Sequence, residues 1–150
     1  MNRASKAEEH TASARGWADV LAGVPLFAGL NHRQLKRVAG AALVRRFHDK
    51  TAIVRAGDTA DSLYIVLDGS VSVRRPGLPE LTLGMGTVFG ETALLDSGPR
   101  SATVIAEGPV TCLAMAQSRF LKTLRTEPAI ALAVLKELAA RLRAVQTAAL

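Results

Sequence analysis

The segment FGETALLDSGPRSATV, residues 89–104, places one carboxylate and one guanidinium among residues that otherwise suit a protein interior. Glu91 follows a glycine, and Arg100 follows a proline nine residues later. An arginine presents a planar fork of N–H donors that suits phosphate oxygens, whereas an ionised carboxylate only accepts hydrogen bonds and suits a sugar hydroxyl. Brought together, these two residue types predict a site for a ligand that carries both a phosphate and a ribose.

The residues between the two charges predict the backbone that holds them. The run TALL, residues 92–95, suits a single helical turn, which a following Gly-Pro pair ends. Backbone N–H groups at the start of such a turn favour an anion, and Gly90 lets a ligand approach the backbone closely. Ser101 adds a hydroxyl next to the arginine. The alternative interpretation is a structural ion pair between Glu91 and Arg100, and spacing alone does not decide between the two.

The segments that must position this site change pattern twice along the chain. From 17 to 47 the apolar residues recur at helical spacing, and Asn31 and Gln34 have the spacing of a capping box. From 51 to 115, short runs of strand-forming residues end in Gly, Pro or Asp, which predicts six or more antiparallel strands. From 118 onward helical spacing returns in two segments. The expected fold class is α+β, a jelly-roll-like antiparallel β-roll flanked by N-terminal helices and two C-terminal helices.

Length and composition indicate a globular domain. The chain has 150 residues, of which 49% are hydrophobic, and this suits one domain with a substantial core. Residues 1–15 are polar, lack the apolar centre of a secretory signal, and are expected to form a flexible tail before a domain at 16–150. No apolar run approaches the roughly 18 residues of a membrane span. The single cysteine, Cys112, fits a buried strand position in a reducing compartment, so a cytoplasmic location is expected.

Catalysis and metal binding are disfavoured by the residue types present. The three histidines, His10, His32 and His48, lie far along the chain from Glu91, and no serine has a plausible histidine and carboxylate pair. One cysteine and isolated histidines lack the spacing of a zinc site, and the chain contains no P-loop. We therefore expect no catalytic residue, no metal and no cofactor.

The net charge of +6 raises the possibility of nucleic-acid binding. The basic residues are scattered along the chain, however, and aromatic residues make up only 4% of it. Without interleaved aromatic side chains there is no platform on which bases could stack. The pattern favours solvated basic faces over a nucleic-acid surface.

Residues 89–104 resemble the phosphate-binding cassette of the cyclic nucleotide-binding domain family, of the catabolite activator and cyclic-AMP-dependent kinase regulatory-subunit type. That pattern runs Phe-Gly-Glu, one residue, Ala-Leu, a short loop and Pro-Arg, followed by small and β-branched residues. VPLFAGLNHRQLKRVA, residues 24–39, resembles the family's opening helical segment. AGDTADSLYIVLDGSVSV, residues 56–73, is similar to its strand pair. The resemblance covers roughly residues 20–146.

The resemblance implies a role for each matching residue of the cassette. Glu91 and the backbone of Gly90 would bind the ribose 2′-hydroxyl. Arg100 would bind the cyclic phosphate, helped by the backbone N–H of Ala93 and by Ser101. Cyclic AMP is the expected ligand rather than cyclic GMP, because members that prefer cyclic GMP tend to carry threonine directly after the arginine.

The base of the nucleotide is expected to contact residues outside the cassette. By position and apolar character, Val73 and Leu81 are the strand residues that would lie against it. In this family a residue of the last helix often closes over the base, and Leu142, Arg143 and Val145 are equally suited to do so.

The resemblance implies a sensor or regulatory domain that repositions its C-terminal helices on binding and so signals to a partner protein. The alternative function is an interaction domain that keeps the fold without binding nucleotide. The chain is either a stand-alone sensor or part of a longer protein, and its effector is not evident. Near-heptad spacing in the last helix leaves two interpretations open, packing on the domain's own roll or a homodimer seam. The residues concerned are Leu135, Leu138, Leu142 and Val145.

Overall fold

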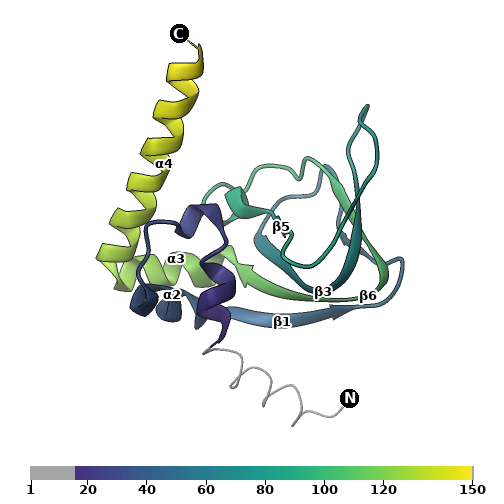
Figure 1. Cartoon of the computed structure of the whole chain (residues 1–150), viewed down its shortest axis with the longest axis horizontal. Helices are drawn as coiled ribbons and strands as arrows, with labels where there is room; N and C mark the ends of the chain where they lie inside the picture. The colour runs from purple at the N-terminus through teal and green to yellow at the C-terminus, as the bar shows by residue number, and fades with distance from the viewer. Residues whose placement is uncertain (1–15, 150) are drawn as a thin grey trace. The chain divides into compact units, whose positions relative to one another are not determined.

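The computed structural model describes residues 16–149, which form two compact units (Figure 1). A helical unit comprises the residues up to Ala41 and from Phe120 onward, and a β unit comprises Ala42–Arg119. The expected flexible tail, residues 1–15, lies outside the described residues. The order of elements confirms the predicted α+β class, an antiparallel roll with helices before it and two helices after it.

The N-terminal part of the helical unit consists of helical residues 16–21, the 3-10 turn η1 (Pro25–Phe27) and helix α2 (His32–Ala39). The side chain of Asn31 accepts a hydrogen bond from the N–H of Gln34, and the Gln34 side chain accepts one from the N–H of Asn31, both at 2.9 Å. This reciprocal pair confirms the predicted capping box and fixes the start of α2.

The C-terminal part contains helix α3 (Gln117–Thr126), whose residues from Phe120 on belong to the helical unit, and helix α4 (Pro128–Ala149). Pro128 begins α4, where its missing N–H costs no hydrogen bond. Inside the unit, the rings of Phe27 and Phe120 lie 5.6 Å apart. In the described part of the chain, no helix is both long enough and apolar enough to cross a membrane.

The structure corrects the helical interpretation of residues 42–47. Helix α2 ends at Ala39 with Gly40 as its C-cap, and Ala42–Phe47 is strand β1. Apolar residues at 35, 38 and 39 fit the helical period, and those at 42 and 43 fit it by coincidence. Periodicity does not show where a helix ends, and antiparallel pairing of β1 with a long strand determines the conformation here.

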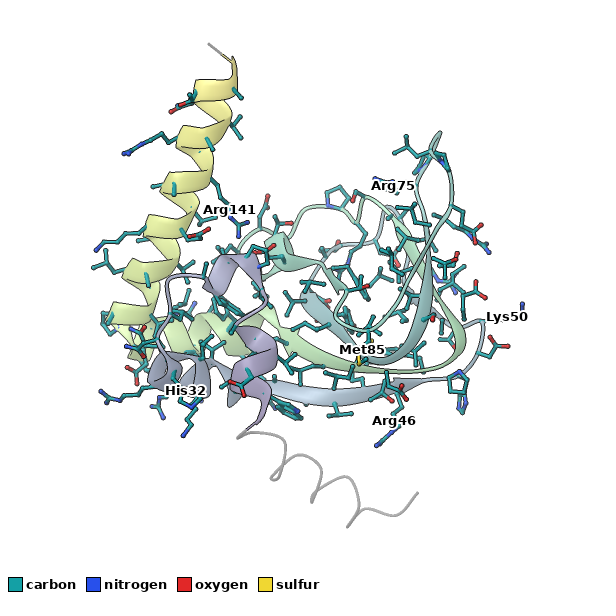
Figure 2. All side chains as sticks on the ribbon, in the orientation of Figure 1. His32, Arg46, Lys50, Arg75, Met85 and Arg141 are labelled. Atoms are coloured by element: carbon teal, nitrogen blue, oxygen red, sulfur yellow. The ribbon has the colours of Figure 1, made fainter. Side chains whose placement is uncertain are left out.

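The β unit is built around two long antiparallel strands, β3 and β6. Strands β1 and β2 pair with β6, while β4 and β5 pair with β3, so every named strand contacts one of the two central ones. Charged side chains such as Arg46 and Lys50 project from the outside of the roll (Figure 2). The strands are β1 (Ala42–Phe47), β2 (Ala52–Val54), β3 (Ser62–Arg74), β4 (Leu81–Leu83), β5 (Val88–Phe89) and β6 (Thr103–Ala116).

Four of the predicted short strands are in fact two long ones. The segments 62–69 and 70–77 contribute to the single strand β3, and 101–108 and 110–115 contribute to β6. Gly69 was expected to end a strand, but it bends β3 instead. Its φ is 96°, and the register with β6 shifts between Val66 and Asp68 and again between Asp68 and Ser70. A Cβ at this position would lie 2.5 Å from the carbonyl oxygen of Pro109, so the two long strands approach closely only because residue 69 is a glycine.

The interior of the roll is formed by side chains that alternate inward along the two long strands. Cys112 is fully buried there and is a free thiol, as expected for a strand residue. This core supports the loops that line the candidate site, and its buried members are Tyr64, Val66, Val71, Val104, Ala106, Val110, Cys112 and Ala114.

Candidate functional site

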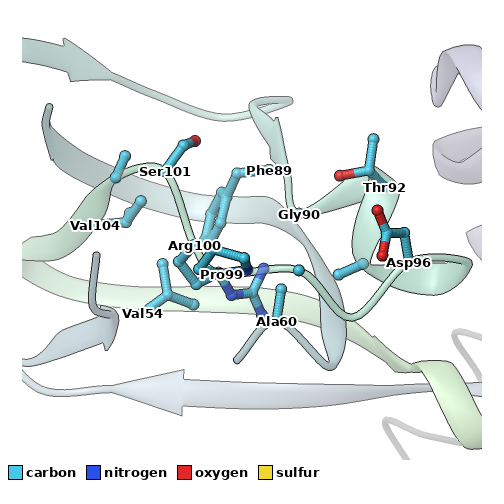
Figure 3. Close-up of a pocket in the computed structure, with 13 residues that line it drawn as sticks. Val54, Ala60, Phe89, Gly90, Thr92, Asp96, Pro99, Arg100, Ser101 and Val104 are labelled. Carbon is cyan, nitrogen blue, oxygen red and sulfur yellow. The ribbon is translucent and has the colours of Figure 1, made fainter. Parts of the chain in front are cut away.

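A pocket of about 350 Å³ lies in the β unit at the segment that the sequence singled out (Figure 3). Four residues that were expected to bind a ligand line it: Gly90, Ala93, Arg100 and Ser101. Apolar side chains such as Val54 complete its walls. The structure therefore brings together the two ends of the segment 89–104, which the short turn η2 (Glu91–Leu94) separates.

Backbone hydrogen bonds fix Arg100 from both sides. The N–H of Gly57 donates to the carbonyl of Arg100 at 2.9 Å, and the N–H of Arg100 donates to the carbonyl of Asp58 at 2.7 Å. The N–H of Ala60 also bonds to the carbonyl of Gly98 at 2.9 Å. The turn at 57–60 thus fixes the backbone of Arg100 independently of the contacts that its side chain makes.

The guanidinium of Arg100 is held at one nitrogen and free at another. Its Nη2 donates to the carbonyl of Ser62 at 2.9 Å and lies 3.8 Å from a carboxylate oxygen of Asp61. Only 7% of the side-chain surface is exposed, and Nη1 is buried without a hydrogen-bond partner in the described part of the chain. A buried polar group left unpaired costs about 1–3 kcal/mol. A hydrogen-bond acceptor for Nη1 would therefore stabilise the site, and the described residues provide none.

The environment of Arg100 also affects its charge. Burial lowers the pKa of the guanidinium, and this effect is partly offset by Tyr64 and Asp61, which raise it. An arginine remains protonated at neutral pH because its ordinary pKa is so high. The result is a poorly hydrated positive charge beside a pocket, which favours an anionic ligand.

The alternative interpretation of the sequence was a structural ion pair between Glu91 and Arg100, but a different carboxylate pairs with Arg100. Within residues 16–149, the ion-pair partner of Arg100 is Asp61. Glu91 is half-buried at the first position of η2, next to the pocket-lining Gly90, and does not itself line the pocket.

Gly90 is required by its contacts with Arg100. Its φ of 78° is left-handed, and a Cβ there would lie 2.5 Å from the carbonyl oxygen of Ser62 and would collide with the guanidinium. The preceding Phe89 stacks on Tyr64 with ring centroids 5.2 Å apart. The backbone before η2 is therefore fixed against both the arginine and the core of the roll.

The predicted helical turn after Gly90 is confirmed as η2, but one of its N–H groups is already engaged. The N–H of Ala93, which was expected to assist the phosphate, donates to the carbonyl of Gly90 at 3.0 Å. Ala93 still lines the pocket, and its role toward a ligand remains a prediction.

The residues expected to contact a base lie outside the pocket. Val73 on β3 pairs with Leu81 on β4, the first half-buried against the core of the roll and the second exposed. Leu142, Arg143 and Val145 are exposed on α4, in the helical unit. The structure leaves all of these roles as predictions.

Sequence reasoning missed the residues that support Arg100. The carbonyl of Ser62 and the carboxylate of Asp61 bind its guanidinium, and Asp96 lines the pocket as a further acceptor. An acidic residue immediately before a strand, as at Asp61, is a signal that could have been noticed. A backbone carbonyl has no sequence signal, because every residue type carries one.

The chemistry that this site offers is binding. The pocket is lined by a buried cation, the hydroxyl of Ser101 and the carboxylate of Asp96, which suit a ligand with an anionic group and hydroxyls. Glu91 lies beside this lining, and its role toward a ligand remains a prediction. Among residues 16–149, no group of three or more His, Cys, Asp or Glu side chains could hold a metal ion.

Comparison with known proteins identifies a family. The model of the cyclic nucleotide-binding domain family matches residues 44–127, more than half of the chain. A cyclic nucleotide-gated potassium channel from Mesorhizobium japonicum is 38% identical over 117 residues, which are 78% of this chain and 32% of the channel. The chain spans about a third or less of the length of the curated relatives it matches.

Solved structures show the same fold. The N-terminal domain of a transcriptional regulator from Streptomyces coelicolor A3(2) is 34% identical with a TM-score of 0.77, covering 88% of this chain and 96% of that one. The regulatory domain of Toxoplasma gondii PKA, solved with cAMP, is 28% identical with a TM-score of 0.64, covering 87% of this chain and 51% of that one.

Proposed function

Because this chain belongs to the cyclic nucleotide-binding domain family, we propose that it is a sensor that binds cyclic AMP in the pocket of its β unit. The observation that carries the proposal is the guanidinium of Arg100, a residue that lines the pocket and whose buried Nη1 has no hydrogen-bond partner among residues 16–149. A cyclic phosphate supplies the missing acceptor together with the opposite charge. The pocket volume of about 350 Å³ lies in the range of small-molecule sites.

The proposed pose places the phosphate against Arg100 and Ser101 and the ribose toward Gly90 and Glu91. For the N–H of Ala93 to reach the phosphate, it must exchange its bond to the Gly90 carbonyl for one to the ligand. The proposed binding domain spans residues 16–150, and it would place the base near Val73 and Leu81. Phosphate contacts then fix the nucleotide, and apolar contacts orient its base.

The preference for cyclic AMP rests on position 101. Serine follows the arginine there, whereas threonine is typical of members that prefer cyclic GMP. The structural relative from Toxoplasma gondii was solved with cAMP, which supports the same choice. Cyclic GMP remains the competing ligand in the test below.

Signalling is the second part of the proposal. Binding would close the cassette, reposition α3 and α4 and thereby change the surface offered to an effector, as a shift between two populated states. Since the matched relatives are much longer, the effector is either another protein or another domain of a longer chain. The single buried cysteine accords with the reducing conditions of the cytoplasm, where we place the protein.

A calorimetric titration of nucleotide-free protein with cyclic AMP, cyclic GMP and AMP in parallel tests the ligand. We expect saturable one-site binding of cyclic AMP, weaker binding of cyclic GMP and much weaker binding of AMP, which lacks the cyclic phosphate. Tighter binding of cyclic GMP would overturn the choice of base. If none of the three bound, the chain would be an interaction domain that keeps the fold without the ligand.

A further inference from the structure

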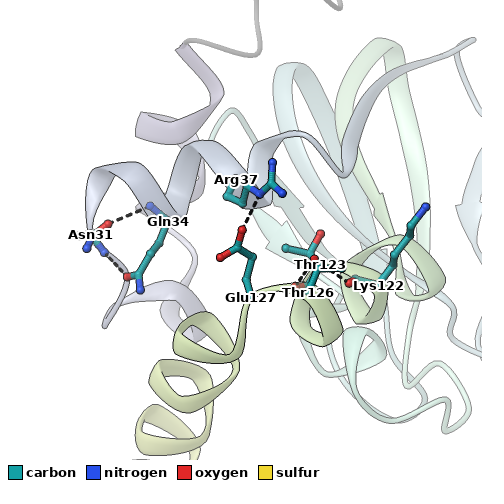
Figure 4. A network of polar contacts seen from close by, with 7 residues as sticks. All are labelled: Asn31, Gln34, Arg37, Lys122, Thr123, Thr126 and Glu127. Carbon is teal, nitrogen blue, oxygen red and sulfur yellow. Dashed lines mark hydrogen bonds and ion pairs between the residues drawn. The ribbon is translucent and has the colours of Figure 1, made fainter.

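A groove of about 410 Å³ lies in the helical unit, between the first turns of α2 and the start of α4 (Figure 4). It belongs to no part of the nucleotide site described above. Polar side chains of α2 form one wall, and the residues at the α3–α4 junction form the other. The polar residues that line it are Asn31, Arg33, Gln34, Arg37 and Glu127.

The capping box of α2 leaves hydrogen-bond donors available to this groove. The side-chain oxygens of Asn31 and Gln34 both accept backbone N–H groups, as the dashed lines in Figure 4 show. Each amide therefore retains an NH₂ group with two donors, and neither group has a partner among residues 16–149. The polar side chains of the groove other than Glu127 are two amides and two arginines, and they consequently offer hydrogen-bond donors rather than acceptors.

Positive charge reinforces this donor surface. Arg33 is exposed and has no ion-pair partner in the described residues, and Lys36 lies one turn further on the same helix. Arg37, 63% exposed, donates from Nε to the carboxylate of Glu127 at 2.8 Å. Residues 16–41 and 120–149 contain eight Lys and Arg against three Asp and Glu, whereas 42–119 contain eight of each. Within the described chain, the excess positive charge thus resides in the helical unit.

We propose that this groove is a docking site for an acidic peptide segment of a partner protein. Carboxylates of the segment pair with Arg33 and accept hydrogen bonds from the amides of Asn31 and Gln34. An apolar side chain of the segment lies against Ala129 at the start of α4, which lines the same groove. Charge complementarity of this kind raises the rate of association and selects against basic partners.

A peptide fits the groove better than a nucleic acid does. No aromatic side chain lines the groove, so bases would find nothing on which to stack. The carboxylate of Glu127 lies among the donors and would repel a continuous run of phosphates. A peptide can space its carboxylates to avoid Glu127, or can compete with it for Arg37. Because Glu127 directly precedes α4, such competition would act at the junction of α3 and α4.

The proposal is tested with a fluorescein-labelled peptide of repeating Glu-Glu-Leu units, followed by fluorescence anisotropy at low salt. The full chain is used without nucleotide, so the result does not depend on whether cyclic AMP binds. We expect saturable binding that weakens as salt is added, since the contacts are exposed. The matched peptide of Gln-Gln-Leu units is expected to bind at least about tenfold more weakly. Equal binding of the two peptides, or no binding of either, would overturn the proposal.

Two charge reversals identify the place of binding. Arg33→Glu is expected to weaken binding of the acidic peptide about fivefold to tenfold. The fold should be retained because this side chain is exposed and forms no ion pair within residues 16–149. Arg75→Glu, in the exposed turn after β3 (Figure 2), makes the same change of net charge and should alter binding by less than about twofold. Equal losses in both variants would show attraction to net charge alone. Tighter binding of a random DNA duplex, lost in Arg33→Glu, would make nucleic acid the occupant instead.

Discussion

Arg100 is supported mainly by a backbone carbonyl rather than by a carboxylate, and this affects its capacity to bind. The carbonyl of Ser62 holds Nη2 at 2.9 Å without neutralising the positive charge. Asp61 is 80% exposed and 3.8 Å away, so water screens much of its effect. The guanidinium is therefore positioned and desolvated, while the contacts among residues 16–149 leave most of its positive charge unneutralised. A close ion pair with Glu91 would have neutralised that charge.

Gly90 gives a prediction with a matched control at the residue scale. We expect Gly90→Ala to lower the free energy of unfolding by about 1–3 kcal/mol, because alanine would be strained at φ of 78° and would clash with the Ser62 carbonyl. The displaced Arg100 should bind cyclic AMP at least about tenfold more weakly, a loss of roughly 1.4 kcal/mol. Urea denaturation and calorimetric titration measure the two effects.

Gly77→Ala serves as the control for this prediction. Residue 77 has φ of 73° in an exposed turn, and a Cβ there meets no atom within 4 Å. The Gly77→Ala protein should have a backbone strain similar to that of Gly90→Ala, while its affinity for nucleotide should equal that of the wild type. A Gly90→Ala protein that bound cyclic AMP as tightly as the Gly77→Ala protein would show that the contact with Arg100 is unimportant.

At the scale of elements, local signals predicted the starts of helices well. The capping box at Asn31 and Gln34 and the proline at 128 each determine where a helix begins through contacts only a few residues apart. The ends of elements depended on distant partners. Residues 42–47 continue a helical apolar spacing, and only pairing with β6 makes them a strand.

The site was predictable to a similar extent. Gly90 and Arg100 were identified because a glycine and an arginine have distinctive side-chain properties, and the structure places both at the pocket. The carbonyl of Ser62 and the turn at 57–60 were not predicted, because backbone contacts between distant segments, such as the 38 residues from Ser62 to Arg100, do not depend on residue type. Glycine positions were also ambiguous, because Gly69 bends a continuous strand instead of ending one.

The burial of Cys112 in β6 predicts a dependence of stability on pH. Burial raises the pKa of its thiol to about 11, from an ordinary value of 9.0, and Arg45 opposes this only in part. The neutral thiol is thus favoured in the folded state, so its contribution to stability is complete below about pH 9 and is lost as the pH rises toward 11. Urea denaturation at several pH values should show stability falling more steeply between pH 9 and 11 in the wild type than in Cys112→Ala. Parallel curves for the two proteins would show that the thiol is not protected in the fold.

At the scale of the whole molecule, α4 presents apolar side chains that residues 16–149 leave exposed. Leu135, Leu142 and Val145 are each about 60% exposed or more, and they share a stripe with Leu138 at near-heptad spacing. Exposed apolar stripes of this kind mark interaction surfaces. We propose that a second copy of the chain covers this stripe, in a dimer joined through α4.

Sedimentation velocity tests the dimer. The wild type is expected to shift from monomer to dimer as its concentration rises, and Leu142→Glu should remain monomeric because it buries a charge in the seam. Ala140→Glu is the control, since this exposed residue lies on the side of α4 opposite the stripe, and the variant should dimerise almost as the wild type does. A wild type that stayed monomeric at high concentration would leave α4 available for a different partner.

The central claim, that the buried and half-unpaired Arg100 is the anchor for a cyclic phosphate, is tested most directly by calorimetric titration of cyclic AMP into three proteins. The wild type should bind one equivalent, and Arg100→Ala should bind about tenfold to a hundredfold more weakly, the worth of a charge-assisted hydrogen bond of about 1.5–3 kcal/mol. Arg75→Ala, which removes an exposed arginine elsewhere in the β unit, should bind as the wild type does. A folded Arg100→Ala protein with unchanged affinity would contradict the account.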